Sequence, residues 1–456
     1  MAIVVAVGLI AVGCRSESTT PEAGPDPVAG ATTVASSAPG AFGDLKNVCQ
    51  PGNATGATDQ GVTDTAIDVG TITDYSFTHD QSPDNTAKAF TEWCNAAGGI
   101  NGRKLQDTVR DTKLFEYRQR ILDACPVDFM LVGGTGSFDG TGVKDRLSCL
   151  LPEFTAQSID AKNAGSDLQF QPVLNTNPSI YYLEGFYTWL LDKYPDSKGA
   201  VGFIKADADV VKVRIDQAKE TIAGLGANVV YDDLFPPIGV SDWGPYAQAI
   251  KSAGVKGLVF SGNPQDLPKL EQALQDANYT LDWIDANPNS YSKSFLDLTG
   301  PLTDQQPNYT EPGVFPLEKS PESPANQQLT AIFKQYVPDG EVNSLAVAGW
   351  SAWLLFAQSA RDCGSQLTRK CVLDNAAKNK AWTAGGVQPP VDLSDKTSKR
   401  VCFTVEHASS SGWTPIELNG PDGKYYRCID NKVTLQGNYP KPVTLADVGK
   451  TMDDLK

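Results

Sequence analysis

The sequence has few of the residues on which most enzyme active sites depend. Only two histidines, His79 and His407, occur in 456 residues, so imidazole offers little for acid–base catalysis or zinc binding. There is no C-x-x-C pair, no H-E-x-x-H motif and no G-x-S-x-G elbow, and Gly134-Thr-Gly-Ser-Phe138 breaks the last pattern. We therefore expect no catalytic residue, no metal, no cofactor and no enzymatic activity. A hydrolase that works with carboxylates alone is the alternative.

Positive charge is also scarce. Lys and Arg number 38 against 54 Asp and Glu, which gives a net charge of −16. This charge repels a phosphate backbone, so nucleic acid is not an expected partner. Hydrophobic residues make up 41% and charged residues 20%, a balance typical of globular proteins, and the length suits two domains.

No Lys or Arg precedes the first apolar run, Ala2–Gly13, which is too short to cross a bilayer as a helix. The run ends in Ala11-Val-Gly-Cys14, which resembles the lipobox of bacterial lipoproteins. That resemblance implies a signal segment at 1–13 and a lipid on Cys14. The basic start of a signal peptide is missing. A plain secretory signal with an incidental cysteine is the alternative.

Large apolar residues are almost missing from residues 15–48, where Pro, Ala, Gly, Ser and Thr recur. Such a composition cannot bury a core. We therefore expect residues 14–60 to form the lipidated cysteine and a flexible tether, and a coil of this kind reaches roughly 30 Å. The tether would hold a folded domain near a membrane.

Eight cysteines remain besides Cys14, and an even number in an exported chain indicates disulfides. Nearness in the chain suggests the pairs Cys363–Cys371 and Cys402–Cys428. Nearness alone leaves the pairing of the other four open; these are Cys49, Cys94, Cys125 and Cys149.

Strand-like and helix-like segments alternate over residues 66–155 and again over 199–284. Repeated β-α units predict parallel sheets with helices on both faces, and the break near residue 178 predicts two α/β lobes. Residues 326–380 are mostly helical in pattern, and 400–435 read as short strands separated by turns.

One corner is distinctive. A helix predicted over 83–97 ends on Gly98-Gly99, the chain turns at Asn101-Gly102, and a strand follows over 104–110. This stretch, Asn95 to Leu105, and the segment Gly61–Gly70 (GVTDTAIDVG) resemble branched-chain amino-acid-type solute-binding proteins of ABC importers. The likeness continues in order over most of residues 61–430.

The resemblance implies a class I periplasmic-binding-protein fold, in which two doubly wound parallel-sheet lobes form a clamshell with a three-segment hinge. The corner would then hold the fold and contact no ligand. Hinge residues are expected near Asn177, Thr310 and Pro390. The expected segments are lobe 1 at 61–177 plus 312–390, lobe 2 at 178–311 plus 391–445, and a tail at 446–456.

The doubly wound order bears on the four remaining cysteines. If the first strand lies between the second and third, the second and third helices share one face of the sheet. Cys125 and Cys149, at the ends of those helices, can then pair, which leaves Cys94 for Cys49.

In open α/β sheets, ligands bind beyond the carboxyl ends of the strands. The resemblance implies that hydroxyls and backbone N–H groups of lobe 1 hold a ligand carboxylate, with Ser76, Ser137, Thr155 and Ser158 as candidates. Hydroxyls in such places also cap helices, which is the competing interpretation. The expected ligand-binding residues are Tyr75, Ser76, Thr135, Gly136, Ser137, Phe138, Thr155, Gln157, Ser158, Asp209, Asn263, Asn287, Asn289 and Tyr291.

The sequence departs from the family in lobe 2. Members that bind amino acids place an acid there for the ligand ammonium, whereas residues 286–290 carry Asn287 and Asn289 and no carboxylate. Asp209 or Asp285 can substitute; otherwise the ligand is an amide, an organic acid or a neutral solute. A phosphate cradle at Gly134-x-Gly136 lacks the lysine of a P-loop.

The sequence therefore predicts an extracellular, lipid-anchored, monomeric binding protein at the outer face of a bacterial cell membrane. It would capture a small polar solute, an amino acid or similar, and deliver it to an ABC permease. A ligand-sensing receptor of the same fold is the alternative.

Overall fold

The first sheet contains the alternating segment predicted as the opening strand. The computed structural model describes residues 38–173 and 182–455, and all neighbours in this sheet are parallel, in the order β2-β1-β3-β4-β5. Strand β1 lies between β2 and β3, which is the doubly wound arrangement that the sequence predicts. The strands are β1 (Ala66–Thr73), β2 (Lys104–Asp111), β3 (Met130–Val132), β4 (Glu153–Phe154) and β5 (Gln169–Phe170).

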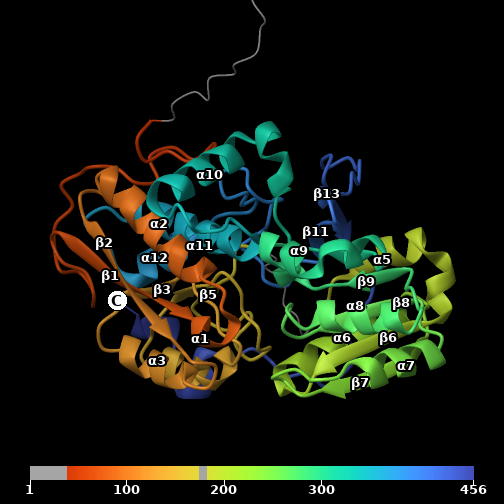
Figure 1. Cartoon of the computed structure of the whole chain (residues 1–456). Coiled ribbons are helices and arrows are strands. Elements are labelled where there is room, and N and C mark those ends of the chain that lie inside the picture. The colour runs from red at the N-terminus through yellow and green to blue at the C-terminus, as the bar shows by residue number, and fades with distance from the viewer. Residues whose placement is uncertain (1–37, 174–181, 456) are drawn as a thin grey trace, which may run out of the picture. The chain divides into compact units, whose positions relative to one another are not determined.

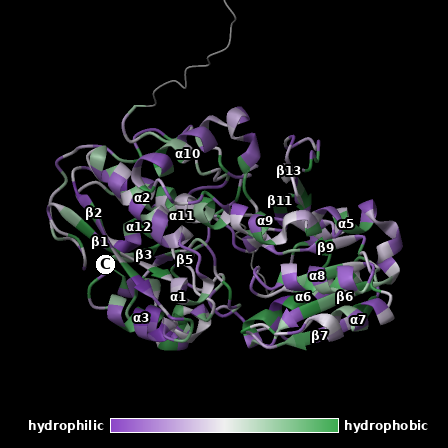
Figure 2. Cartoon of the chain, viewed as in Figure 1, coloured by the Kyte–Doolittle hydropathy of each residue, from purple (hydrophilic) through white to green (hydrophobic). Residues whose placement is uncertain are grey.

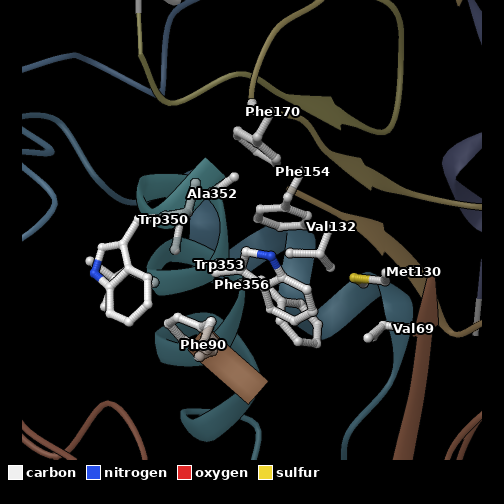
Figure 3. Packing of buried hydrophobic residues seen from close by; sticks show 14 of the residues in the cluster. Val69, Phe90, Met130, Val132, Phe154, Phe170, Trp350, Ala352, Trp353 and Phe356 are labelled. Atoms are coloured by element: carbon white, nitrogen blue, oxygen red, sulfur yellow. The ribbon is translucent and has the colours of Figure 1, made fainter. Parts of the chain in front are cut away.

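The helices packed with this sheet come from two distant parts of the chain (Figure 1). They are α1 (Tyr75–Thr78), α2 (Ser82–Ala96), α3 (Tyr117–Ala124), α4 (Val143–Ser148), α10 (Pro324–Tyr336), α11 (Ser344–Arg361) and α12 (Arg369–Ala376). Helix α11 is apolar on all sides and lies buried, as such helices do. Its Trp353 stacks on Phe90 of α2, with ring centroids 5.2 Å apart (Figure 3).

The second sheet has the order β13-β12-β10-β9-β8-β6-β7, and its strands carry hydrophobic stretches, clearly along β6 (Figure 2). Strands β12 and β13 run antiparallel at one edge, and the others are parallel. The strands are β6 (Val201–Ala206), β7 (Val229–Phe235), β8 (Gly257–Ser261), β9 (Trp283–Asp285), β10 (Asn308–Thr310), β12 (Glu406–Ser409) and β13 (Gly412–Pro415).

Five helices pack around the second sheet, and the two strands of a separate ribbon flank the last two strands of that sheet in the chain. The helices are α5 (Glu184–Lys193), α6 (Asp209–Gly224), α7 (Gly244–Ser252), α8 (Leu267–Asp276) and α9 (Lys293–Thr299). The ribbon pairs β11 (Arg400–Thr404) with β14 (Tyr426–Asp430). The fold is thus the predicted α/β architecture of two lobes built on parallel sheets, both inside the unit Ser37–Lys456.

The C-terminal segment adds a fourth crossing to the three that were expected. Tyr439 still contacts the second lobe, where its hydroxyl donates to Glu220 of α6 at 2.7 Å. Val443 and Leu455 are buried in the core of the first lobe. The structure therefore differs from the expected boundary at 445 and from a tail at 446–456. Hinge candidate Asn177 lies outside the described residues, and Thr310 ends β10 just before the crossing at 311–316.

The N-terminal side also differs from the expectation. Signal segment 1–13, Cys14 and the tether up to residue 37 lie outside the described residues. Phe42 and Val48, however, are fully buried in the core of the first lobe, and the Phe42 ring lies 5.3 Å from that of Trp350. The tether predicted up to residue 60 is therefore wrong for this part. A few apolar side chains anchor a segment whose average composition is that of a coil.

The glycine corner is confirmed as a structural feature. Gly98, Gly99, Asn101 and Gly102 all have positive φ angles, between 52° and 112°. A Cβ atom at Gly99 would lie 2.0 Å from the carbonyl oxygen of Arg103, so only glycine fits there. None of these residues lines the cavity described below.

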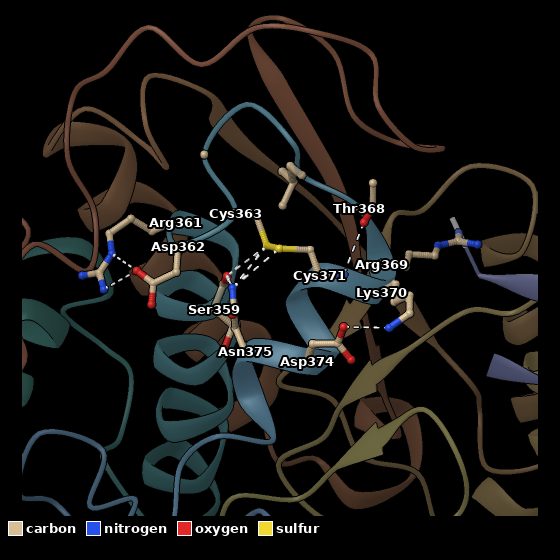
Figure 4. Close-up of a disulfide and its surroundings, with 12 residues drawn as sticks. Ser359, Arg361, Asp362, Cys363, Thr368, Arg369, Lys370, Cys371, Asp374 and Asn375 are labelled. Carbon is tan, nitrogen blue, oxygen red and sulfur yellow. Dashed lines mark hydrogen bonds and ion pairs between the residues drawn. A yellow bond between two sulfur atoms is a disulfide. The ribbon is translucent and has the colours of Figure 1, made fainter. Parts of the chain in front are cut away.

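All four predicted disulfides are present: Cys49–Cys94, Cys125–Cys149, Cys363–Cys371 and Cys402–Cys428. The third joins the end of α11 to α12, and the Thr368 hydroxyl caps that helix by accepting from the N–H of Cys371 at 3.3 Å (Figure 4). Among the helices of the described segments, none has the length and hydropathy needed to span a bilayer.

Candidate functional site

A cavity of about 740 Å³ lies between the two lobes. Its wall includes the residues that follow the carboxyl ends of β3, β4, β6, β8, β9 and β10. This is the position that open parallel sheets reserve for ligands. The volume suits an organic molecule of moderate size.

Nine of the fourteen expected ligand-binding residues line this cavity: Thr135, Ser137, Phe138, Gln157, Ser158, Asp209, Asn263, Asn287 and Asn289. The other five do not: Tyr75, Ser76, Gly136, Thr155 and Tyr291. All five lie in or beside the correct loops. Local hydrogen bonding and packing direct four of them elsewhere.

Two of the expected hydroxyls outside the wall are engaged with the protein itself. Ser76 donates its hydroxyl to the carboxylate of Asp111 on β2. Thr155 donates to the carbonyl oxygen of Gly134 at 2.8 Å. These two hydroxyls serve the local loop structure, and neither makes the helix cap of the competing interpretation.

Packing explains two others. Tyr291 is buried, and its hydroxyl donates to Glu318 at 2.6 Å, so it is not an aromatic wall of the cavity. At Gly136, a Cβ atom would lie 2.4 Å from the ring of Tyr117, so this glycine permits close packing on α3. Tyr75 is 36% exposed.

Two lobe 1 donors at the cavity wall, the backbone N–H of Ser137 and the hydroxyl of Ser158, are occupied by the protein's own carboxylates. Asp74 accepts hydrogen bonds from the Thr112 hydroxyl and from the backbone N–H of Ser137. It lies at the end of β1 and lines the cavity, and its side chain is almost fully buried. The backbone N–H of Ser137 is thus already hydrogen-bonded within the protein.

Asp139 also occupies donors of lobe 1, in this case donors of the loop that follows β4. Its carboxylate accepts from the Ser158 hydroxyl at 2.7 Å and from the backbone N–H groups of Ile159 and Asp160 at 3.0 and 2.7 Å. Burial raises the pKa of Asp139 to about 7, although these hydrogen bonds act in the opposite direction. Ser158 therefore lines the cavity without a free hydroxyl proton for a solute.

Arg214, on α6, is the only cation among the described residues that line the cavity. Its Nε donates to the carbonyl oxygen of Ile159 at 3.1 Å, and its Nη2 donates to that of Ser158 at 3.3 Å. Both acceptors belong to the other lobe, so Arg214 bridges the lobes. The guanidinium also lies 5.9 Å from the ring centroid of Tyr182. Its Nη1 makes no hydrogen bond to any described residue.

A second bridge between the lobes runs through the loop after β9. Asn289 Nδ2 donates to Gln157 Oε1 at 3.4 Å. Asn287, two residues earlier, has φ 60° and ψ 159°, a conformation that non-glycine residues resist and that concentrates at functional sites. Its Nδ2 is buried at the wall of the cavity and has no hydrogen-bond partner within residues 38–173 and 182–455.

Glu311 follows β10 directly and also lines the cavity. It is 3% exposed, and its Oε2 has no hydrogen-bond partner among the residues that the structure describes. Burial raises the pKa of Glu311 well above its usual range, and the charge of nearby Asp285 adds to the effect. Burial likewise raises the pKa of Asp285 to about 6, although Tyr187 donates to it at 3.0 Å.

Apolar side chains from both lobes cover most of the wall. They include Phe77, Phe115, Phe138, Ile238, Leu298 and Phe403. Phe115 is 77% exposed, and its ring stacks on that of Phe138 at 5.5 Å; Ile238 is 86% exposed. The apolar lining thus extends to the mouth of the cavity. Within residues 38–173 and 182–455, no group of three or more His, Cys, Asp or Glu could hold a metal ion.

Sequence reasoning missed Arg214, Glu311 and Phe403. Arg214 lies on a helix where a charged residue normally indicates a solvent-facing position, and Phe403 lies in a strand far along the chain. Glu311 alone had a signal, because it follows a strand and precedes Pro312, where the chain leaves the sheet.

The fold is shared by solved structures of solute-binding proteins. A fatty acid ABC transporter substrate-binding protein from Thermomonospora curvata is 18% identical, with a TM-score of 0.68, over 86% of this chain and 99% of that one. A leucine-binding protein from Thermotoga maritima is 12% identical (TM-score 0.63; 76% and 97%). A solute-binding protein from Rhodopseudomonas palustris, solved with 3,4-dihydroxybenzoic acid, is 13% identical (TM-score 0.60; 76% and 97%).

No curated protein matches the sequence. The family model for periplasmic binding proteins matches residues 177–405, half of the chain. Proteins of this family and the similar structures bind solutes for ABC transporters. The chain therefore belongs to the periplasmic binding protein family.

Proposed function

We propose that this protein captures an apolar solute with one acidic group and delivers it to an ABC permease. The observation that carries the proposal is Arg214, whose guanidinium is only partly hydrogen-bonded among the described residues and lies in a mainly apolar cavity. Guanidinium groups bind carboxylates through charge-assisted hydrogen bonds, and apolar walls favour a hydrophobic body.

The carboxyl groups of the wall do not form a counterpart site for a cation. Most are engaged: Asp74 by Thr112 and Ser137, Asp80 by Ser82, Glu184 by the backbone of Lys432 and Val433, and Asp207 and Asp209 by Lys212. The sixth, Glu311, is buried under conditions that favour its neutral form.

A free amino acid, the solute class suggested by the sequence, suits the cavity less well. Two donors of lobe 1, the Ser137 N–H and the Ser158 hydroxyl, are filled by Asp74 and Asp139, and the loop after β9 offers amides instead of a carboxylate. A solute's ammonium would have no ionised, unpaired acid within the buried wall. The carboxylate of an amino acid could bind Arg214, but its ammonium would lack a charge contact.

The names of similar proteins support the acid. One is named for a fatty acid and another was solved with 3,4-dihydroxybenzoic acid, both acids with a hydrophobic part, whereas a third is named for leucine. These likenesses are weak in sequence, so the contacts of Arg214 remain the main support.

Capture would work by closure of the lobes. Arg214 and Asn289 already join the lobes by hydrogen bonds, and a solute bound at Arg214 would contact residues on both sides. A solute that contacts both lobes binds the closed form more tightly and so shifts the population towards it.

We also propose that a lipid on Cys14 anchors the protein at the outer face of the cell membrane. The support is the apolar run before Ala11-Val-Gly-Cys14 and the polar stretch after it. A Cys14→Ser variant should leave the membrane fraction for the medium, and mass spectrometry should find diacylglyceryl only on the native chain. Retention of the variant on membranes would contradict the anchor.

The solute class can be tested with three probes that share one body: octanoate, octan-1-ol and octylamine, with leucine as a fourth. Calorimetric titration at neutral pH should show octanoate as the tightest ligand and no binding of leucine. A charge-assisted contact is worth about 1.5–3 kcal/mol, or about 10- to 150-fold in affinity over octan-1-ol. Tighter binding of octylamine or leucine would refute the proposal.

A further inference from the structure

Helix α6 is connected to the first lobe at two places. Arg214 donates to the carbonyl oxygens of Ser158 and Ile159, in the loop between β4 and β5. Glu220, further along the same helix, binds the C-terminal segment, and this segment then continues to the same loop. The helix and the loop are therefore joined once by a side chain and once by the chain that follows β14.

The contact of the C-terminal segment with α6 depends on one carboxylate. Glu220 accepts from the backbone N–H groups of Gln436 and Gly437, the second at 3.1 Å, and from the Tyr439 hydroxyl at 2.7 Å. Burial acts to raise the pKa of Glu220, but these hydrogen bonds outweigh it, and the pKa lies below its usual value. Gln436 and Gly437 are exposed, so this anchor lies at the surface and is made of polar contacts.

The anchor on the first lobe is apolar and buried. Val443, Leu445 and Leu455 belong to the core of that lobe, and Figure 1 shows the C-terminus beside it. The Val443 N–H donates to the carbonyl oxygen of Lys162 at 2.9 Å, and the Leu445 N–H donates to Asp167 at 2.7 Å. Burial of apolar side chains adds to these hydrogen bonds, so the anchor on α6 is the weaker of the two.

The chain between the two anchors is short and stiff. Its sequence is Tyr439-Pro-Lys-Pro-Val443, and each proline fixes its own φ angle and restricts the preceding residue to extended conformations. Pro442 lies against Gly165 of the loop, where a Cβ atom would be 3.5 Å from its Cγ. Four residue steps span at most about 14 Å. The two anchors cannot move further apart than this while both of them hold.

We propose that Glu220 is a latch, and that its hold on residues 436–439 limits how far the two lobes open. The limit acts between α6 and the loop after β4, which are elements of the cavity's two sides. Wide opening then requires the carboxylate to release the segment, whereas small movements leave the latch closed. This inference concerns the motion of the lobes and does not depend on the class of the solute.

The length of the chain shows how much the latch controls. When Glu220 releases the segment, Val433 stays bound to the second lobe, because its N–H donates to Glu184 of α5 at 2.8 Å and its side chain packs on Gly224 of α6. The ten steps from Val433 to Val443 span at most about 35 Å, against about 14 Å with the latch closed. Release of one carboxylate thus more than doubles the allowed span.

Two variants remove this limit in different ways. Glu220→Ala takes away the acceptor of all three hydrogen bonds. Insertion of Gly-Ser-Gly-Ser after Lys441 leaves the latch in place and adds about 14 Å to the span. Small-angle scattering of the ligand-free full-length proteins should give both variants a larger radius of gyration than the native protein. Asp276→Ala is the matched control, because it removes an acid that accepts from Gln272 on α8 of the same lobe, and it should leave the scattering curve unchanged.

Hydrogen exchange identifies the contact that gives way. The amides of Gln436 and Gly437 should exchange about 10-fold faster or more in E220A than in the native protein, because each loses a hydrogen bond to a charged acceptor. The amides of Val443 and Leu445 should exchange equally in both proteins. In the insertion variant, all four amides should keep their native protection, because both anchors are intact.

A native-like scattering curve from either variant would overturn the inference, and so would amides at 436 and 437 that exchange equally fast in the native protein and in E220A. The insertion leaves every contact of Glu220 in place, so it tests the length of the span even where E220A is unstable. None of these measurements uses a solute. Their failure would therefore leave the proposed function intact, and failure of the octyl probes to bind would leave the latch intact.

Discussion

Replacement of Arg214 by alanine is the perturbation that the structure interprets most fully. The change removes the only cation in the described wall of the cavity, together with two hydrogen bonds, of 3.1 and 3.3 Å, that join α6 to Ile159 and Ser158 of the other lobe. It should therefore affect both solute binding and the closed arrangement of the lobes.

The two effects have different sizes. Loss of a hydrogen-bonded charge contact costs about 1.5–3 kcal/mol, which weakens octanoate by about 10- to 150-fold. The two hydrogen bonds between the lobes contribute about 1 kcal/mol each, and only in the closed form, so their loss favours opening. Lysine keeps the charge but not the planar fork, so Arg214→Lys should fall between alanine and the native protein.

The assay is calorimetric titration with octanoate and with octan-1-ol, combined with small-angle scattering of the ligand-free proteins. The affinity for octan-1-ol should differ between R214A and the native protein only through the loss of the two hydrogen bonds between the lobes. The preference for octanoate over octan-1-ol should therefore vanish in R214A. Lys219→Ala is the matched control, because it removes one positive charge from the same helix at a residue that pairs with Asp216 and Asp232, and none of these three residues lines the cavity. Undiminished preference for octanoate in R214A would refute the reasoning.

Three further predictions concern stability. Burial raises the pKa of Glu271 from 4.5 to about 8, so the stability that this group contributes is complete below pH 4.5 and is lost as pH rises through 8. The free energy of unfolding should fall by up to about 1.4 kcal/mol per pH unit over this range. Urea unfolding of E271Q at several pH values should not show that fall. The Cys49–Cys94 disulfide closes a 45-residue loop, so Cys49→Ser should lower the free energy of unfolding in urea by about 4 kcal/mol. A decrease below about 1 kcal/mol would contradict this prediction. Trp353→Ala in the core of the first lobe should lower the unfolding free energy by about 3–5 kcal/mol in the same assay, and an unchanged midpoint would be inconsistent with its full burial.

The disulfides show how far the sequence could reach. Nearness gave two pairs, and the position of β1 between its neighbours placed the ends of α3 and α4 on one face, which gave Cys125–Cys149. Strand order and cysteine position are both local or topological properties, so pattern reasoning can recover them. The position of the cavity at the carboxyl ends of the strands could be predicted because it too follows from strand order.

The details of the cavity depend on contacts between segments distant in sequence. Ser158 was chosen for its hydroxyl, but that hydroxyl serves Asp139, and only the folded loop reveals this. Arg214 gains its role because its helix faces the other lobe, which no periodicity in α6 records. Phe42 and Val48 belong to the core because a disulfide beside them holds a coil-like segment in place.

A crystal structure of the native protein grown with octanoate tests the proposed site most directly. We expect the carboxylate within hydrogen-bond distance of Arg214, with the alkyl chain along apolar side chains such as Phe138 and Phe403. A cavity that stays empty of octanoate, or a carboxylate held instead by Ser137 and Ser158, would contradict that expectation.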